Sequence, residues 1–312
     1  MVRYGARRVE QQRVMITGAS GFIGSLLYDT LSAQGLQVFG TGGPTSQRHI
    51  AYDIRSEAAS MAVVSEINPD VVIHAAAISS VTKGRPEDYY AVNVVGTENL
   101  LKAVSTLGKK VRFIFLSTAG VYGNQRVEVL SEDLTPLPRH HYGISKLAAE
   151  HVVGLYADKI DSTILRPFNI IGPNQDESFI VPKLVNAFAM KDEVIRLGNI
   201  NVYRDFMDVW TSVAIIAKLI DSPASFGKVI NLCTGHGTSL LELLDALRGL
   251  TGQSPRIEQA PEFMRSNEIW RLTGDATKLR ASVGDEMLRT PPIEDILSIM
   301  LDERRASLDA ST

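Results

Sequence analysis

The sequence has little of what marks secreted, membrane-spanning or nucleic-acid-binding proteins. A single cysteine, Cys233, excludes a framework of intrachain disulfides and suits a reducing compartment. No stretch reaches the roughly 18 uninterrupted apolar residues of a transmembrane helix. Lys and Arg together number 32 against 35 Asp and Glu, so the net charge of −3 provides no excess positive charge for nucleic acid or an anionic membrane. We therefore expect a cytoplasmic protein with neither nucleic acid nor membrane as a partner.

The rest of the composition is that of an ordinary globular protein. Its 312 residues, 45% of them apolar, suffice for one large core, or for a large core with a smaller lobe at its edge, with no metal needed to hold them together. Cys233 ends the apolar stretch 229–233, so we expect a buried, unreactive side chain rather than a nucleophile. Residues 1–12 contain several arginines with no apolar run behind them and are expected to form a frayed tail.

Short apolar runs alternate along the chain with segments of helical periodicity. The runs are continuous, which is typical of strands buried on both faces of a parallel sheet. The predicted strands span residues 13–17, 37–40, about 50–52, 71–75, 111–117 and 162–166. The predicted helices span residues 21–35, 56–67, 89–107 and 142–156. Right-handed crossovers then give an α/β fold with a Rossmann-type, doubly wound parallel sheet.

A glycine-rich loop stands where the first predicted strand ends. Gly18, Gly21 and Gly24 are spaced three apart at the start of the first helix. Gly18 permits a sharp turn, Gly21 lets the backbone approach a diphosphate, and Gly24 lets helix and strand pack closely, while the helix N-terminus attracts negative charge. Glycines at a tight turn are the alternative explanation. The position of the loop favours a dinucleotide site that includes Ser20, Phe22 and Ile23.

The end of the second predicted strand bears on the choice of cofactor. Residues 38–43 contain no acid to hold the adenosine ribose hydroxyls, and Ser46 and Arg48 follow. This favours NADP(H) and leaves NAD(H) open, since Arg48 could equally be an exposed loop cation. After the third strand, Asp53 could accept a hydrogen bond from the adenine amino group, and Ile54 could cover the adenine ring.

The regular alternation of strands and helices ends after residue 169. We expect residues 13–169 to form a dinucleotide-binding Rossmann domain, which also receives about residues 206–234 through a helix at 211–221 and a strand at 229–232. Segments 170–205 and 235–312 are expected to form a smaller, discontinuous C-terminal lobe that binds the substrate.

A tyrosine and a lysine, Tyr142 and Lys146, lie four residues apart and so share one face of a predicted helix. A neighbouring ammonium and an oxidised nicotinamide ring both favour a phenolate, so we expect the pKa of Tyr142 to be lowered. Tyr142 could then exchange a proton with a hydroxyl or carbonyl while hydride moves at the same carbon. Such pairs also occur on helix surfaces, but here the pair follows the glycine loop and Ser117–Thr118 at a strand end.

Taken together, these motifs resemble the extended short-chain dehydrogenase/reductases, the NAD-dependent epimerase/dehydratase group. The resemblance runs in order over about residues 13–300. The segments that carry it are the glycine loop, residues 74–77 (HAAA), 93–97 (NVVGT), 117–123 (STAGVYG), Tyr142 with Lys146, and 166–173 (RPFNIIGP).

The resemblance implies roles for individual residues. Thr118 and Tyr142 would contact the reacting sugar oxygen as catalytic residues, and Lys146 would act with them and hold the nicotinamide ribose. Ala75, Ala76, Ala77 and Phe168 would line the cofactor cleft, with Asn93 supporting it. The nucleotide diphosphate of a nucleotide-sugar substrate would bind Asn169, Arg204 and Arg265; guanidinium groups suit phosphate because they bind its oxygens in pairs.

The residues after Thr118 narrow the chemistry. Dehydratases of the family carry an Asp-Glu pair there, whereas this chain has Ala119 and Gly120, which cannot move protons. Residues 198–208 and 265–268 are most similar to reductases of the GDP-4-keto-6-deoxy-D-mannose type. We therefore expect reduction of a nucleoside-diphosphate 4-keto-6-deoxyhexose, with Tyr142 as general acid.

Two alternatives remain open. Small residues after Thr118 also resemble 4-epimerases, which use tightly bound NAD. A protein of another class would sense a dinucleotide without turnover, although intact Thr118, Tyr142 and Lys146 argue against it. For His140 and His141 we expect a plain helix start rather than a proton relay. The family commonly forms homodimers through helices equivalent to 89–107 and 142–156, for which Val152, Val153 and Tyr156 are candidate contacts, unless they are core residues.

Overall fold

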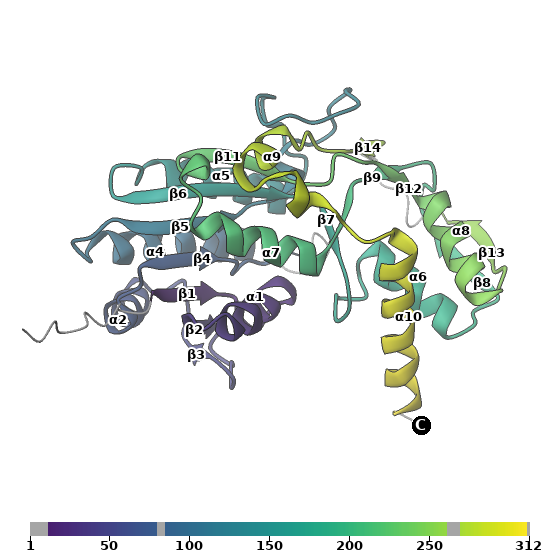
Figure 1. Ribbon diagram of the computed structural model, residues 1–312, viewed down its shortest axis with the longest axis horizontal. Helices are drawn as coiled ribbons and strands as arrows, with labels where there is room; N and C mark the ends of the chain where they lie inside the picture. Colours follow the sequence, from purple (N-terminus) through teal and green to yellow (C-terminus); the bar gives the residue numbers. More distant parts are fainter. Residues whose placement is uncertain (1–11, 80–84, 261–268, 311–312) are drawn as a thin grey trace, which may run out of the picture.

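A seven-stranded parallel sheet dominates the computed structural model, which describes residues 12–79, 85–260 and 269–310 (Figure 1). The frayed tail expected at residues 1–12 therefore lies, apart from Gln12, outside the described residues. The strands, in their order across the sheet, are β11 (Lys228–Leu232), β6 (Ile160–Pro167), β5 (Val111–Leu116), β4 (Val71–His74), β1 (Arg13–Thr17), β2 (Gln37–Gly42) and β3 (Ile50–Ala51). The order reverses between β1 and β4, and such a point places a crevice at the carboxyl ends of the strands.

Helices cover both faces of this sheet, as predicted. Along β1, Val14 and Ile16 join the core beneath α1 (Phe22–Ala33), α7 (Val209–Ile220) and α9 (Thr277–Val283). Met15 points the other way, into the core beneath α2 (Glu57–Ile67), α4 (Gly96–Ser105) and α5 (His141–Gly154). Both faces of β1 are thus buried, which explains the continuous apolar run. Cys233 is fully buried, as predicted, and burial raises the pKa of its thiol.

The helix predicted at 89–107 is observed as three consecutive pieces. Helix α3 (Pro86–Tyr90) passes through a π turn, η1 (Ala91–Val95), into α4. The π turn adds a residue to one helical turn, and such insertions cluster at functional sites. Asn93, in the middle of η1, is buried and bonds to groups outside the helix, so tertiary contacts rather than local propensity explain the interruption.

A third core lies beside the sheet, at the right of Figure 1. It is enclosed by α6 (Ile180–Ala189), α8 (Leu240–Thr251), α10 (Ile293–Asp309) and the strand pair β8 (Val194–Leu197) with β13 (Arg256–Gln259). Helix α8 begins with a capping box between Ser239 and Glu242 and ends at Gly252, whose φ of 68° is accessible to glycine at little cost.

Short strands join this lobe to the sheet. The pair β7 (Asn169–Ile171) with β10 (Phe206–Asp208) and the trio β12 (Thr238–Ser239), β9 (Tyr203–Arg204) and β14 (Arg271–Leu272) lie between the two. Helix α9, within the segment assigned to the lobe from sequence, instead packs on α7 and β11. The division into a dinucleotide-binding domain and a substrate-binding lobe stays a prediction.

The outer face of α4 and α5 bears on the expected dimer. Of the two explanations left open for Val153, burial in the core is confirmed, because its side chain is 0% exposed. The hydroxyl of Tyr156 donates a 2.8 Å hydrogen bond to Glu98, tying α5 to α4. The apolar side chains exposed along these helices are Val95, Ile144 and Leu155.

Candidate active site

A cleft of about 1170 Å³ opens between the carboxyl ends of the sheet strands and the lobe. Most of the site residues predicted from sequence line it: Gly18, Gly21, Phe22, Ile23, Gly24, Ala75, Ala77, Thr118, Tyr142, Phe168, Asn169 and Arg204. The structure therefore gathers into one hollow residues that are nearly 190 positions apart in the chain.

The glycine loop forms a tight backbone cradle at the start of α1. Gly18 has a φ of +71°, and a Cβ atom there would lie 2.7 Å from the backbone nitrogen of Ala76. A Cβ on Gly24 would lie 2.1 Å from the carbonyl oxygen of Gly18. Gly21 precedes α1 and provides no side-chain cap, so the backbone N–H groups of the first turn of α1 stay available at this end of the cleft. This arrangement suits a diphosphate and fits the dinucleotide predicted from the sequence.

The residues expected around the adenosine lie at the ends of β2 and β3. Exposed Ser20 has its hydroxyl 3.3 Å from that of Ser46, after β2. The guanidinium of Arg48 forms an ion pair with Asp29 on α1 and lies 5.4 Å from the ring centre of Tyr28. Arg48 is therefore held against α1, although half of its side chain remains exposed.

Asp53 and Ile54 follow at the next strand. Both carboxylate oxygens of Asp53 accept hydrogen bonds from Arg55, at 2.7 to 3.0 Å. Ile54 is buried beneath α4, where a Cβ on Gly96 would lie 2.8 Å from its Cγ2. Neither residue lines the main cleft.

A buried hydrogen-bond chain links β1, β4 and η1 behind the cradle. Thr97 Oγ1 donates to the carbonyl of Asn93 at 2.7 Å, so it must accept from Nε2 of His74, 2.9 Å away. Nδ1 of His74 is then an acceptor for the hydroxyl of Thr17 at 2.6 Å, and that hydroxyl accepts from the backbone N–H of Ala76 at 3.2 Å. Burial, helped by the charge of Lys146, lowers the pKa of His74 to about 3. The neutral His74 ring thus orients the Thr17 hydroxyl, which in turn fixes the Ala76 backbone against the glycine loop.

Asn93 connects this chain of hydrogen bonds to α5, the helix that carries Tyr142. Its side chain bonds both backbone groups of Ile78, at 2.9 and 3.2 Å, and donates to Ser145 at 3.0 Å. Ser145 in turn donates to the carbonyl of Tyr142 at 2.8 Å. Asn93 therefore supports the cleft from behind, where the resemblance placed it.

Tyr142 lines the cleft beside Thr118. Burial raises the pKa of its phenol to about 12, and a hydrogen bond with the Thr118 side chain opposes that rise. The sequence predicts a lowered pKa, from the charges of Lys146 and of an oxidised nicotinamide ring. The direction is opposite in this structure because the loss of solvent outweighs the polar neighbours. The phenol therefore carries its proton at neutral pH, as a general acid must.

Lys146 lies one turn further along α5 and does not line the cleft. Its side chain is 1% exposed, and Nζ lies 4.1 Å from the centre of the Phe115 ring. Burial lowers the pKa of Lys146 to about 7, and the charge of Glu150 opposes that shift. The protonation of this lysine is therefore finely balanced near neutral pH.

His140 is a cleft residue that sequence reasoning missed. It begins α5, as expected, with Nδ1 accepting a 2.9 Å bond from the N–H of Gly143. Its ring also stacks on that of Tyr142, with centres 6.0 Å apart, and lines the cleft. A Cβ on Gly120 would lie 3.2 Å from His140 and 3.3 Å from Thr118, so a larger side chain there would require these neighbours to shift. The position of His140 two residues before Tyr142 was the available signal.

The lobe end of the cleft holds two of the predicted phosphate ligands. Arg204 bonds the carbonyl of Tyr203 at 2.8 Å, and Asn169 bonds the carbonyl of Asp205 at 3.1 Å. The buried carboxylate of Asp205 accepts four bonds, from Thr234 N and Oγ1 and from the N–H groups of residues 235 and 274. Asp205 thereby fixes the strand that presents Arg204. The third predicted ligand, Arg265, lies outside the described residues.

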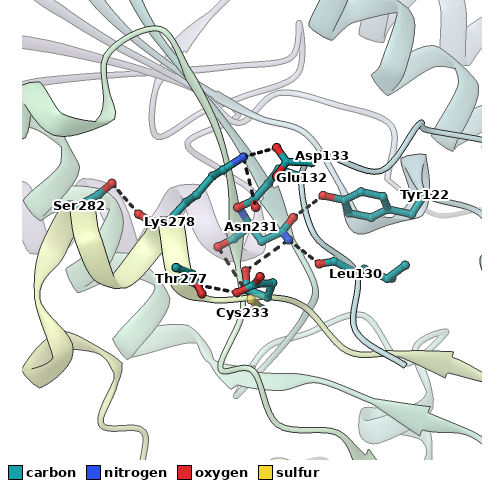
Figure 2. A network of polar contacts seen from close by, with 10 residues as sticks. Tyr122, Leu130, Glu132, Asp133, Asn231, Cys233, Thr277, Lys278 and Ser282 are labelled. Carbon is teal, nitrogen blue, oxygen red and sulfur yellow. Dashed lines mark hydrogen bonds and ion pairs between the residues drawn. The ribbon is translucent and has the colours of Figure 1, made fainter. Parts of the chain in front are cut away.

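The segment after Thr118 is anchored by a polar network around Asn231 (Figure 2). Asn231 accepts from the Tyr122 hydroxyl at 2.6 Å and donates to the Leu130 carbonyl at 2.8 Å. Its N–H donates to Glu132, which also approaches Lys278 of α9. The network fastens this segment to β11 and α9.

Within residues 12–79, 85–260 and 269–310, no three or more His, Cys, Asp or Glu side chains come together as metal ligands would. No helix in the same ranges is long and apolar enough to cross a membrane.

Comparison with known proteins places this cleft in context. The sequence model of the NAD dependent epimerase/dehydratase family matches residues 14–233. The chain is 36% identical to GDP-6-deoxy-D-talose 4-dehydrogenase of Aggregatibacter actinomycetemcomitans over 95% of this chain and 99% of that one. It is 33% identical to GDP-6-deoxy-D-mannose reductase of Pseudomonas aeruginosa, over 88% and 91% of the two chains.

Solved structures show the same fold with both nicotinamide cofactors. RMD from Pseudomonas aeruginosa complexed with NADPH superimposes with a TM-score of 0.82 at 29% identity, over 95% of this chain and 98% of that one. UDP-glucose 4-epimerase from Thermus thermophilus, complexed with NAD, gives a TM-score of 0.82 at 28% identity, over 95% and 100%. The Rossmann-type sheet predicted from sequence is thus confirmed.

Proposed function

Because this chain belongs to the NAD-dependent epimerase/dehydratase family, we propose that it reduces the 4-keto group of a nucleotide-linked 6-deoxyhexose, reversibly, with a nicotinamide cofactor. Membership makes the chain an enzyme of nucleotide-sugar chemistry. The names of its two relatives, a 4-dehydrogenase and a reductase, both describe one net hydride transfer on a GDP-linked 6-deoxy sugar. A GDP-4-keto-6-deoxyhexose is accordingly our first choice of substrate.

The observation that carries the proposal is the pairing of Thr118 with a protonated Tyr142 in a wall that holds Ala119 and Gly120. Reduction of a ketone requires one proton donor at the carbonyl oxygen, and Tyr142 supplies it while Thr118 bonds the same oxygen. A bound nicotinamide would supply the hydride. Dehydration requires a further acid and base, which Ala119 and Gly120 do not supply.

The remaining residues divide between the two ligands. We assign the cofactor diphosphate to the glycine cradle, and the nicotinamide half to Phe168 with the backbone of residues 75–77. The substrate diphosphate is assigned to Asn169 and Arg204, which line the lobe end of the cleft. The neighbouring hydroxyls of Ser20 and Ser46 at the end of β2 favour NADP(H) over NAD(H), and a reductase-type relative that binds NADPH supports this choice.

A 4-epimerase with tightly bound NAD is the second candidate function. The small residues beside Thr118 favour it, since a ketosugar needs room to turn over between the two steps, and so does the structural likeness to an NAD-bound epimerase. A dinucleotide sensor without turnover is the candidate from another class.

The direct test mixes the purified protein with NADPH or NADH, with and without GDP-4-keto-6-deoxy-D-mannose, and follows the absorbance of the reduced cofactor at about 340 nm. We expect stoichiometric loss of absorbance that requires the sugar and is faster with NADPH. Recovery of a stereoisomer without net loss would instead support the epimerase, and no change in the sugar would leave sensing or another substrate.

We also propose a homodimer built on the outer faces of α4 and α5, where Val95, Ile144 and Leu155 are exposed. Leu155 is 81% exposed, so burial against a second copy would explain an apolar side chain there. We expect Leu155→Glu to give a folded monomer in light scattering after gel filtration, while Leu250→Glu, on the lobe, leaves the dimer intact. Equal masses for the Leu155→Glu variant and the unmodified protein would contradict this interface.

A further inference from the structure

The face of α5 that carries the catalytic pair continues one turn further. Tyr142, Lys146 and Glu150 follow one another at four-residue intervals, so they lie one above the other along the helix. Glu150 is 6% exposed and Lys146 is 1% exposed, so neither charge is solvated from outside. A buried carboxylate next to a buried ammonium requires an explanation, because each is costly to remove from water unless it is paired.

Glu150 is held in place by two partners from neighbouring strands. Its two carboxylate oxygens accept bonds from Nε and Nη2 of Arg166, at 3.0 and 2.7 Å. The hydroxyl of Ser117, at the end of β5, also donates to Glu150 Oε1, at 2.5 Å. Arg166 packs in turn over the ring of Tyr122, 4.9 Å from its centre. The carboxylate is therefore fixed on α5, one helical turn beyond Lys146.

The other groups around Lys146 do not replace this negative charge. On α5 the neighbouring titratable group is Tyr142, which is neutral at pH 7. From β4 comes the neutral ring of His74, and β5 presents the ring of Phe115. From β6 comes Arg166, whose charge repels an ammonium, while Asn93 of η1 and Thr118, two residues after β5, carry no charge. Glu150 is the one anion among these groups.

We propose that Glu150, clamped by Arg166, is a positioning residue whose charge favours the protonated form of Lys146 behind Tyr142. It acts through its charge rather than through contact with substrate. Its catalytic consequence rests on the proposed function. When Tyr142 gives its proton to the sugar carbonyl, a phenolate remains, and an adjacent ammonium stabilises it whereas a neutral amine does not. Burial favours the neutral form of Lys146, and the charge of the carboxylate opposes that effect.

The test measures the titration of Lys146 directly, without substrate or cofactor. The protein is labelled with [13Cε]lysine, the Lys146 signal is assigned by its loss in Lys146→Gln, and its chemical shift is followed from about pH 5 to about pH 10. In Glu150→Gln the midpoint should fall by about one pH unit or more, a tenfold loss of proton affinity. Arg166→Gln keeps the Glu150 anion and removes the neighbouring cation, so the midpoint of the Lys146 titration should rise.

The opposite signs separate an electrostatic role from a structural one, since loosened packing would move both midpoints in the same direction. Ser117→Ala, which removes a hydrogen bond to Glu150 and no charge, is the matched control and should leave the midpoint within a few tenths of a unit. If either single variant fails to fold, the double variant Glu150→Gln/Arg166→Gln replaces the pair by amides and should still show a lowered midpoint. An unchanged midpoint in the variants lacking Glu150 overturns the proposal, whether or not the protein reduces a ketosugar.

Discussion

Replacing Tyr142 by phenylalanine is expected to lower kcat by about a hundred- to ten-thousandfold, the usual contribution of a positioned general acid. The hydroxyl is the group that lies beside Thr118 in the cleft, and phenylalanine removes it while keeping the ring that stacks on His140. Cofactor affinity should stay within a few-fold of the original, because the cradle formed by Gly18, Gly21 and Gly24 is untouched. The measurement is a pair of titrations, turnover by absorbance and NADPH binding by fluorescence.

The same variant distinguishes the two enzyme functions from the sensor. A reductase and an epimerase both lose turnover, whereas a sensor would keep its dinucleotide binding, which is its whole function.

The pH dependence adds a second check on the role of Tyr142. The phenol of Tyr142 has a pKa raised to about 12, so reduction should continue across neutral pH, and oxidation of the alcohol should accelerate as the pH rises toward that value. A Tyr142→Phe enzyme with undiminished turnover would remove Tyr142 from the mechanism.

Substituting alanine for Gly24 is expected to have the second large effect. The added Cβ would lie 2.1 Å from the carbonyl oxygen of Gly18, so α1 must move away from the loop. Crowding of this kind costs about 1–3 kcal/mol, which corresponds to roughly ten- to hundredfold weaker dinucleotide binding if the strain falls on the cradle. Helix propensity alone would favour alanine over glycine at this position. A loss of dinucleotide affinity in Gly24→Ala would therefore come from the close packing of α1 on the loop.

Gly249→Ala is the matched control, because nothing lies within 4 Å of a Cβ at that position on α8, away from the cleft. It should bind NADPH as tightly as the original protein. Equal affinities for the Gly24→Ala and Gly249→Ala variants would mean that the dinucleotide does not use this cradle.

Sequence patterns predicted the sheet well because its strands carry their own signal. Residues 113–116 are apolar without interruption, and β5 is indeed buried on both faces. The π turn at Ala91–Val95 carried no such signal, since its residues keep helical spacing and the turn is explained by bonds from Asn93 to Ile78 and Ser145. The return of α9 to the sheet likewise depends on contacts between segments far apart in the chain.

The candidate site was predictable where spacing alone places side chains together. Tyr142 and Lys146 sit on one face of α5, and the same rule would have identified Glu150 one turn later. The sign of the pKa shift of Tyr142 was not predictable, because it depends on how much solvent the surrounding strands exclude. The cleft-lining role of His140 required the position of Gly120 from another segment.

Helix α9 has a consequence for exchanging substrate preference between relatives. Because Lys278 reaches Glu132 and Asp133 across the chain, the last part of the sequence crosses back from the lobe to the sheet before α10 returns to the lobe. A chimaera made by swapping a single C-terminal tail would therefore place the relative's α9 against this chain's sheet. Grafts of separate lobe pieces, made on either side of residues 275–288, would exchange the lobe while each parent kept its own α9.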